Sequence, residues 1–127
     1  MTGNELLNMS LDLLGLRDSD GNLTSDVDDL KQRSVSLINI VIAENAEIDN
    51  RIRKGEHSVR SIETLDDIID CTEIIARSVL PYGLARLLSV GEDDALSNSL
   101  AKLYEDARRN AVRFGKARVK PIAEVYR

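Results

Sequence analysis

The sequence predicts a small all-α domain in which about four helices pack as a bundle. Apolar residues recur every three or four positions in four separate stretches, which is the period of an amphipathic helix. No stretch alternates apolar and polar residues as a half-buried strand does. Aromatic residues make up 3% of the chain, so the core is expected to be aliphatic, as suits packed helices. A length of 127 residues fits one domain.

The first helix is expected over about residues 4–14, with leucines along one side and Gly15 as its end. The loop that follows, LRDSDGNLTSD, is rich in turn-forming residues. Its Asp18, Asp20 and Asn22 resemble the first ligands of a calcium loop. However, the glycine follows the second aspartate directly and the twelfth position holds no glutamate. An ordinary turn is therefore favoured over a calcium site.

The second helix is expected to be the longest, over about residues 25–53, with Ser25 as its N-cap. Around its middle, Ile38, Ile40 and Ile42 widen the apolar stripe beyond one face. A helix that is apolar on more than one side lies at the centre of its domain or is covered by a second subunit. The sequence leaves both arrangements open, and the three isoleucines are the candidate subunit interface.

The third helix is expected to begin at Thr64 as N-cap and to end at Gly91. Its second half, LPYGLARLL, contains Pro81 and Gly83, which helix interiors tolerate poorly. Pro81 has no N–H for the carbonyl of Arg77, so the helix is expected to kink there or to restart with Pro81 in its first turn. Gly83 lacks a side chain, which lets another helix approach closely. Together they predict a bent helix whose second half packs against the fourth.

The fourth helix is expected to run from the acidic EDDA at 92–95 to Gly115. The remaining KARVKPIAEVYR is interrupted by a proline and is expected to be extended. This divides the chain into a helical domain at 1–115 and a basic arm at 116–127.

Charge is distributed unevenly along the chain. Residues 1–107 hold ten Lys or Arg against 21 Asp or Glu, a net charge of −11, whereas residues 108–127 hold seven against one, a net charge of +6. An acidic body with a basic tail suggests an interaction segment. The alternative, cations that favour the end of a helix dipole, accounts for the arginines up to 113 but not for the later ones. The candidate docking residues of the arm are Lys116, Arg118, Lys120, Ile122, Val125 and Tyr126.

No residue pattern indicates catalysis, a cofactor or a metal. His57 is the only histidine and lies in a polar loop, without a second histidine as metal ligand. Cys71 lies within an apolar helical pattern and is interpreted as a small buried side chain. The acidic pairs at 28–29, 66–67 and 93–94 fall in expected first helical turns, where the helix dipole explains them. We therefore expect a protein that is not an enzyme.

Membrane and secretion signals are also missing from the pattern. The longest apolar run, LINIVIA at 37–43, is too short to cross a bilayer. The start has neither a basic leader nor an apolar run, and a single cysteine forms no internal disulfide. A soluble protein of a reducing compartment is expected. The basic tail suits nucleic acid, but the acidic body and the few aromatic side chains make direct DNA readout the weaker alternative.

Four short elements, an LDD-I segment, a PYGLA-LL helix, an acidic turn and a YE-A motif, follow one another in the second half of the chain. Their run resembles the helical head–tail connector proteins of tailed bacteriophages, also called adaptor or head-completion proteins. The ending IAEVYR is similar to the short tail of those proteins, and the match spans about residues 61–127. In order, the elements are Leu65–Ile68, Pro81–Leu88, Glu92–Asp94, Tyr104–Ala107 and the ending Ile122–Arg127.

The resemblance implies a subunit of a ring that lies between the capsid's portal and the tail. Such rings extend the DNA channel, help to retain the packaged genome and give the tail a docking surface. The implied partners are further copies of this chain, the portal protein, the next head-completion or tail protein, and DNA that passes without sequence-specific binding; no membrane is involved. The implied location is the head–tail junction of the virion, and the bacterial cytoplasm before assembly.

Three features fit this implication. The wide apolar stripe of the second helix suits lateral ring contacts, and the basic arm suits docking onto an acidic neighbour. An acidic body lets DNA pass, because phosphate contacts would retain it. Two other functions stay open: another small helical phage packaging or tail-assembly factor, and a DNA-binding regulator that uses the basic C-terminal tail.

Overall fold

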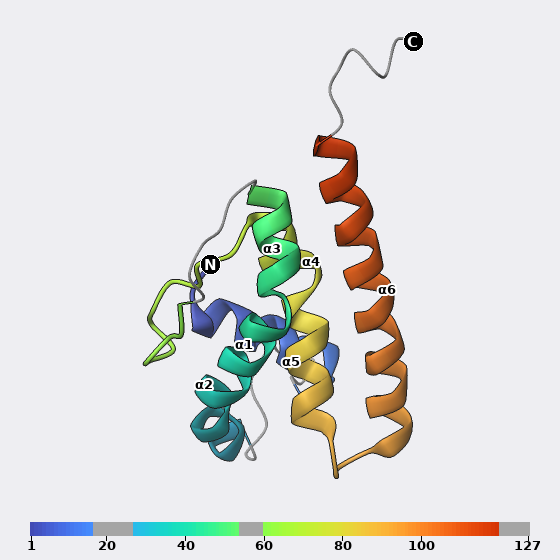
Figure 1. Ribbon diagram of the computed structural model, residues 1–127. Helices are drawn as coiled ribbons and strands as arrows, with labels where there is room; N and C mark the ends of the chain where they lie inside the picture. Colours follow the sequence, from blue (N-terminus) through green and yellow to red (C-terminus); the bar gives the residue numbers. More distant parts are fainter. Residues whose placement is uncertain (17–26, 54–59, 120–127) are drawn as a thin grey trace.

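The computed structural model describes the backbone of residues 1–16, 27–53 and 60–119, and the side chains of 1–16, 29–53 and 60–113 (Figure 1). The described residues form helices, one isolated bridge between Thr2 and Ile68, and no strand, so the all-α prediction is confirmed. The helices are α1 (Gly3–Leu13), α2 (Val27–Glu44), α3 (Ala46–Arg53), α4 (Glu73–Ser78), α5 (Leu80–Ser89) and α6 (Asp94–Val119).

Helix α1 begins and ends close to the predicted residues. The hydroxyl of Thr2 accepts a hydrogen bond from the backbone N–H of Glu5 at 3.2 Å, which satisfies one of the free amides of the first turn. The chain leaves the helix through Gly15, whose φ of +69° is the left-handed conformation that glycine adopts without strain. Leu6 and Leu11 on the inner side of α1 are fully buried.

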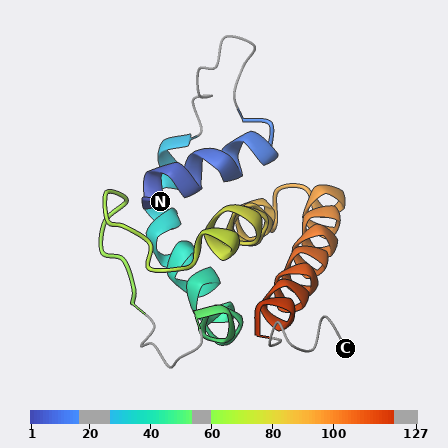
Figure 2. The same cartoon turned by 90° about the horizontal axis from the view of Figure 1, so that it is seen from above.

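The predicted helix over 25–53 is interrupted at Asn45, so the expectation of one continuous helix is wrong. The side-chain amide of Asn45 donates to the carbonyl of Val41 at 2.8 Å, while its backbone N–H bonds to Ile42 at 3.2 Å. Asparagine side chains compete in this way with the backbone of a helix. Helices α2 and α3 consequently point in different directions, and α3 is seen nearly end-on in Figure 2.

The predicted third helix begins at Glu73 instead of after Thr64, because residues 60–72 bond elsewhere. The carboxylate of Asp67 accepts from the amides of Glu63 and Thr64 at 2.7 and 3.0 Å and closes a turn. Thr64 is therefore not an N-cap, and the pair 66–67 does not lie in a first helical turn.

The same segment bonds through its backbone to the start of α1. The N–H of Asn4 donates to the carbonyl of Leu65 at 2.8 Å, and the N–H of Ile69 donates to the carbonyl of Met1 at 2.8 Å. These long-range bonds replace the helical ones that the local pattern predicts. Ile68, which falls within the predicted third helix, is 74% exposed.

The apolar stretch around Pro81 restarts as a new helix. α4 ends at Ser78, Val79 separates the two helices, and Pro81 lies in the first turn of α5, where its missing N–H has no intrahelical partner to lose. The carbonyl of Pro81 accepts a hydrogen bond from the buried hydroxyl of Ser10 at 3.2 Å, which joins α5 to α1.

Gly83 lies where α5 meets two other helices. A β-carbon added there would be 2.7 Å from Cγ1 of Val41 on α2 and 2.8 Å from Cε1 of Tyr104 on α6. Distances this short show that no side chain fits between the helices. The sequence-based prediction that Gly83 permits a close helix approach agrees with this geometry.

Helix α6 passes through Gly115 and continues to Val119, so the predicted helix end and the start of the extended arm are both wrong by about four residues. Glycine lowers helix stability by only about 1 kcal/mol, and the next strong breaker is Pro121, which disfavours helix at the residue before it. Lys116 and Arg118 thus lie on α6. Residues 120–127, with the candidates Lys120, Ile122, Val125 and Tyr126, lie outside the described residues.

The core is aliphatic and centres on α5, which packs against α1, α2, α4 and α6 (Figures 1 and 2). Ile38 and Ile42 are 0% and 3% exposed and belong to this core. Their assignment to a subunit interface is therefore wrong, because the chain's own helices cover both side chains. Ile40 is 48% exposed on the outer side of α2, and its assignment stays a prediction.

Over the described residues, none of the helices combines the length and the apolar character that crossing a bilayer requires.

Candidate functional site

A polar cluster occupies the junction of α2, α3, α5 and α6, where the aliphatic core meets the surface. Asn45, between α2 and α3, is fully buried, and Tyr104 on α6 is nearly so. Buried polar groups are stable only where hydrogen bonds replace those they lose to water. We call this set the junction cluster; its members are Glu44, Asn45, Arg86, Tyr104 and Arg108.

Asn45 uses both ends of its side-chain amide. Its Nδ2 donates to the carbonyl of Val41 at 2.8 Å and to the hydroxyl of Tyr104 at 2.9 Å. Its Oδ1 accepts from Nε of Arg108 at 3.1 Å, and a second nitrogen of Arg108 donates to the carbonyl of Glu44 at 3.0 Å. Two residues of α6 therefore hold the break between α2 and α3.

Tyr104 lies at the centre of the cluster. Its hydroxyl donates to the carboxylate of Glu44 at 3.0 Å, and burial, as the largest cause, raises the pKa of the phenol to about 12. The group therefore stays a neutral hydrogen-bond donor. The guanidinium carbons of Arg86 and Arg108 lie 4.9 and 5.5 Å from the ring centroid, which adds cation–π attraction.

Arg86 on α5 connects the cluster to a third helix. Its Nη2 donates to the carboxylate of Glu44 at 3.1 Å, whereas its Nε is buried and has no hydrogen-bond partner among the described atoms. The negative charge of Glu44 thus receives one tyrosine hydroxyl and one guanidinium. The cluster is an ionic and polar anchor for the helix junction, and it contains no arrangement of nucleophile and base.

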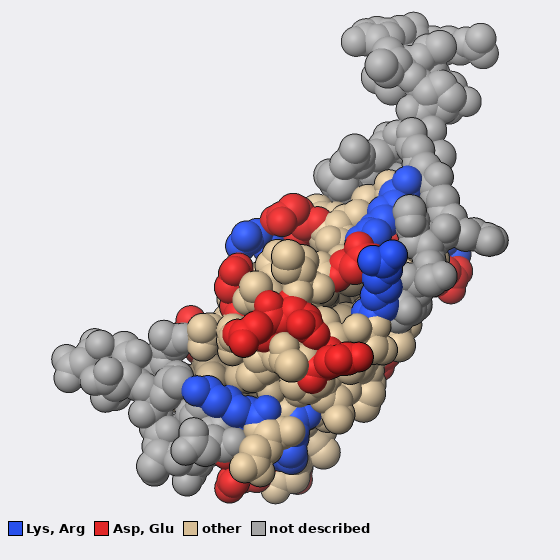
Figure 3. All heavy atoms as spheres, turned by 90° about the vertical axis from the view of Figure 1, so that its left-hand side faces the viewer, with Lys and Arg blue, Asp and Glu red and all other residues tan. Residues whose placement is uncertain are grey.

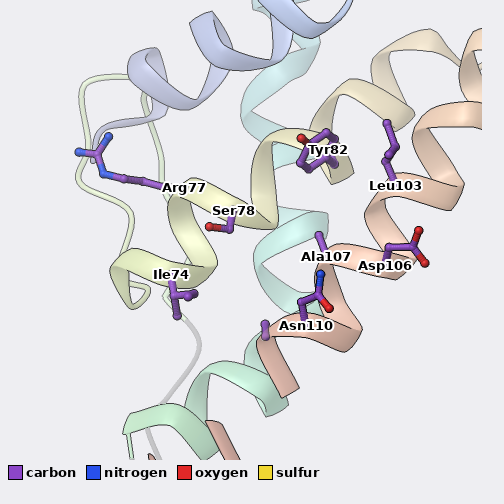
Figure 4. A pocket seen from close by; sticks show the side chains of 9 residues that line it. Ile74, Arg77, Ser78, Tyr82, Leu103, Asp106, Ala107 and Asn110 are labelled. Atoms are coloured by element: carbon purple, nitrogen blue, oxygen red, sulfur yellow. The ribbon is translucent and has the colours of Figure 1, made fainter. Parts of the chain in front are cut away.

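A groove of about 530 Å³ runs between α4, α5 and α6 (Figure 4). Tyr82 and Leu103 face each other across one end, Ala107 and Asn110 of α6 line another part, and Arg77 projects away from it. Leu103 is 48% exposed. The lining mixes apolar and polar side chains, which fits a contact with a protein surface better than an enclosed small-molecule pocket.

A second hollow, of about 700 Å³, is lined by residues that directly follow α1, by α2, by α5 and by the start of α6. Its lining includes the apolar side chains of Leu16 and Leu88 and the charged side chains of Asp29 and Arg33. The described residues that line this hollow define no binding site.

An ion-pair group fixes the start of α4 against α3. The carboxylate of Asp49 accepts from Nε of Arg53 at 2.9 Å and from the backbone N–H of Thr72 at 2.8 Å, and Arg53 also bonds to Asp70 at 3.0 Å. The adjacent Cys71 is half-buried, and desolvation raises the pKa of its thiol to about 12. A thiol with this pKa is weakly nucleophilic near neutral pH.

The structure brings together few of the residues that the sequence singled out. Among side chains in the described ranges, no group of three or more His, Cys, Asp and Glu is placed to hold a metal ion. Asp18, Asp20, Asn22 and His57 lie outside those ranges. Asp94 lies in the first turn of α6 as expected, whereas Asp93 precedes the helix and caps it, because its carboxylate accepts from the N–H of Leu96 at 3.0 Å.

The junction cluster was not predicted from the sequence. One signal pointed to it: positions 41, 45, 48 and 52 continue the apolar 3–4 spacing of the second predicted helix, yet position 45 holds asparagine. A polar residue at a core position of an amphipathic helix demands a buried partner. The partners Tyr104 and Arg108 carry no comparable signal in the sequence.

Charge on the surface is grouped. On the face shown in Figure 3, acidic side chains gather in the middle, and basic side chains lie toward its edges. Exposed acids of the segment before α4 include Glu63, Asp66 and Asp70. The negative body expected from the sequence therefore includes at least one face on which acids lie next to one another.

Comparison with protein-family models, with curated proteins and with solved structures finds no match to this chain. The resemblance to phage connectors consequently stays a prediction, and function is argued below from residues and geometry.

Proposed function

We propose that this protein is a structural virion protein, a head–tail connector subunit that assembles as a ring between the portal and the tail of a bacteriophage. It extends the DNA channel and helps to retain packaged DNA, without catalysis or a cofactor. The observation that carries the proposal is the helix crossing at Gly83. There the PYGLARLL element of α5 meets the YEDA element of α6, because Gly83 leaves no room between itself and Tyr104.

This crossing supports the resemblance in a specific way. The two elements lie about 20 positions apart in the sequence, and the residues common to the connector-like pattern are those that set the distance between α5 and α6. The same residues form no reactive arrangement that an enzyme would need.

Docking onto the portal is assigned to the basic end of the chain. Arg108 and Arg109 are engaged within the chain, the first by Asn45 and the second by Asp106 at 2.6 Å. The positive charge left for a partner therefore lies further along, in Lys116, Arg118 and Lys120. The apolar contact area is assigned to Ile122, Val125 and Tyr126, and an acidic neighbouring subunit is the complementary surface.

Two further features support a ring. Ile40 is an exposed apolar side chain on α2 and is available for contact with a second copy. The acidic face in Figure 3 suits a channel wall, since phosphates are repelled and DNA moves past. The chain is then located at the head–tail junction, and in the bacterial cytoplasm before assembly.

The test uses the portal protein encoded by the same genome. Purified chain is mixed with it, and negative-stain electron microscopy and sedimentation measure ring formation and portal capping. We expect capping by the natural chain and loss of it in the triple variant Lys116→Glu, Arg118→Glu and Lys120→Glu. A control with equal charge change, Lys31→Glu, Arg51→Glu and Lys102→Glu on exposed helix positions, should still cap the portal.

Three results contradict the proposal. One is a genome that encodes no portal, capsid or tail protein near this chain. Another is a portal that never binds it, and the third is equal loss of capping in the arm and control variants. A helical packaging or tail-assembly factor of the same phage is the alternative if the chain binds other virion proteins but never the portal.

A DNA-binding regulator is the weaker candidate, favoured by the cationic last turns of α6. Binding to a short duplex that weakens steeply with added salt, and that the arm variant abolishes, would support it. The acidic face shown in Figure 3 argues against a broad DNA-binding surface.

A further inference from the structure

We propose that Asn45 is a hinge and that the junction cluster is the latch that keeps it bent. In the latched state α3 packs against α6 and points away from the axis of α2. When α6 moves off α3, α2 and α3 join into one straight helix over about residues 27–53. This inference does not rest on the proposed function.

The hydrogen bonds at the break itself favour a hinge at Asn45. In a continuous helix the carbonyl of Val41 accepts the backbone N–H of residue 45. Here the backbone N–H of Asn45 bonds instead to Ile42 at 3.2 Å, and the Asn45 side chain takes the carbonyl of Val41 at 2.8 Å. The side chain thus holds the position of a helical hydrogen bond, which the backbone can recover if the side chain turns away.

Hydrogen bonds from the neighbouring helices stabilise the bend. Three of the bonds at the break come from α6: the Tyr104 hydroxyl accepts from Asn45 Nδ2, and Arg108 donates to Asn45 and to the carbonyl of Glu44. Arg86 adds a bond from α5 to the carboxylate of Glu44. Bonds to charged groups of this kind stabilise by more than neutral ones. The bent state is therefore tied to the docked position of α6.

The apolar pattern of the sequence fits a straight helix as well as a bent one. Apolar residues continue with a 3–4 spacing across the break, from Ile38 and Val41 to Ile48 and Ile52, and all four are buried in the core. In a straight helix these four residues would also lie on one face. Straightening therefore keeps the apolar face intact. Two arrangements of one segment are thus compatible with its pattern.

The bend at Asn45 is coupled to the position of α6. α6 packs against α3 and α5 and leads into the cationic end of the chain. A partner that binds α6 better after it has left α3 shifts the balance toward the straight state, in proportion to that difference in affinity. The orientation of α3 therefore changes when a partner displaces α6.

The test measures the separation of α3 and α6 by pulsed electron paramagnetic resonance. Spin labels are placed with Arg51→Cys and Arg109→Cys, both exposed, in a background with Cys71→Ser. α3 has eight residues. A rotation of about 30° at Asn45 moves its far end by roughly 6 Å, since eight residues of helix are about 12 Å long.

Asn45→Ala is the direct variant, because alanine removes the competing amide and favours helix. We expect the label distance to lengthen by roughly 5 Å or more and α2–α3 to become one protected helix in hydrogen exchange. A variant that keeps the distance of the natural chain overturns the proposal, because packing alone then sets the bend.

Tyr104→Phe is the mild variant, since it keeps the ring and removes one hydroxyl. We expect amides 45–49 to exchange about tenfold faster, while amides of α1 keep their rates. The matched control is Tyr82→Phe, which removes the same hydroxyl from α5 outside the cluster and should leave those amides unchanged. Equal rates at 45–49 in both variants and the natural chain overturn the latch.

Discussion

Gly83→Ala tests the close approach of α5 to α2 and α6 with a single methyl group. The added carbon would lie 2.7 Å from Cγ1 of Val41 and 2.8 Å from the ring of Tyr104. Neither neighbour yields easily: valine is stiff about its first side-chain torsion, and the Tyr104 hydroxyl is held by Asn45 and Glu44. The helices must therefore move apart or the side chains must leave their preferred rotamers.

The magnitude follows from two opposing effects. Replacing glycine by alanine inside a helix stabilises by about 1 kcal/mol. Overpacking a tight core costs about 1–3 kcal/mol, and contact with two stiff neighbours places this site toward the upper end. We expect a net loss of about 2 kcal/mol in the free energy of unfolding. For a domain of this size, that lowers Tm by roughly 8 °C.

The assay is urea and thermal unfolding followed by circular dichroism. A second variant, Gly83→Ala with Val41→Ala, removes one of the two obstructing side chains. Its total destabilisation should be smaller than the sum of the single variants by about 1 kcal/mol or more, since the residues are in contact. A stabilised Gly83→Ala, or strict additivity in the double variant, would refute the close approach.

The remaining predictions concern titration and reactivity. Burial raises the pKa of Tyr104 to about 12, so the native state holds this proton longer than the unfolded state; stability should be intact below about pH 10 and fall between pH 10 and 12. Tyr104 should correspondingly form tyrosinate only near its raised pKa, and Tyr104→Phe should remove that late step from the absorbance titration. The Cys71 thiol, whose pKa burial raises to about 12, should react with iodoacetamide at neutral pH at least about 100-fold more slowly than in urea, measured by mass spectrometry. Backbone hydrogen bonds from Thr64 and Glu63 lower the pKa of Asp67. The contribution of this carboxylate to folding stability should be fully present above the ordinary carboxyl pKa, and it should be lost as pH falls through the lowered pKa of the native state. Asp67→Asn should therefore speed proteolysis within residues 60–69 at neutral pH while leaving α6 protected.

The parts of the fold that could be predicted from sequence are those where local signals and tertiary contacts agree. α1 has a capping Thr2, an unbroken leucine face and Gly15 at its end. The start of α6 lies at the predicted acidic stretch 92–95, where the carboxylate of Asp93 caps the helix. At Pro81 the choice between a kink and a restart depends on neighbouring packing, which the sequence leaves open.

The parts that could not be predicted depend on contacts between distant residues. Leu65 and Ile69 fit a helical pattern, but their backbone groups bond to residues at the start of α1. From the sequence, Ile38 and Ile42 widen the apolar stripe beyond what one buried helix face needs. The central position of α5 explains them, because both side chains belong to the core around it. The junction cluster joins residues about 60 positions apart, and periodicity describes only neighbours along the chain.

The central position of α5 also governs how this chain is built on the ribosome. Synthesis proceeds at roughly 5–20 residues per second, so α1, α2 and α3 are made several seconds before Leu80–Ser89 is free to join them. Without α5 the leucines of α1 and the isoleucines of α2 lack the helix against which both pack. The nascent first half therefore exposes apolar side chains until α5 has been synthesised. During this interval it is prone to aggregation unless a chaperone binds it.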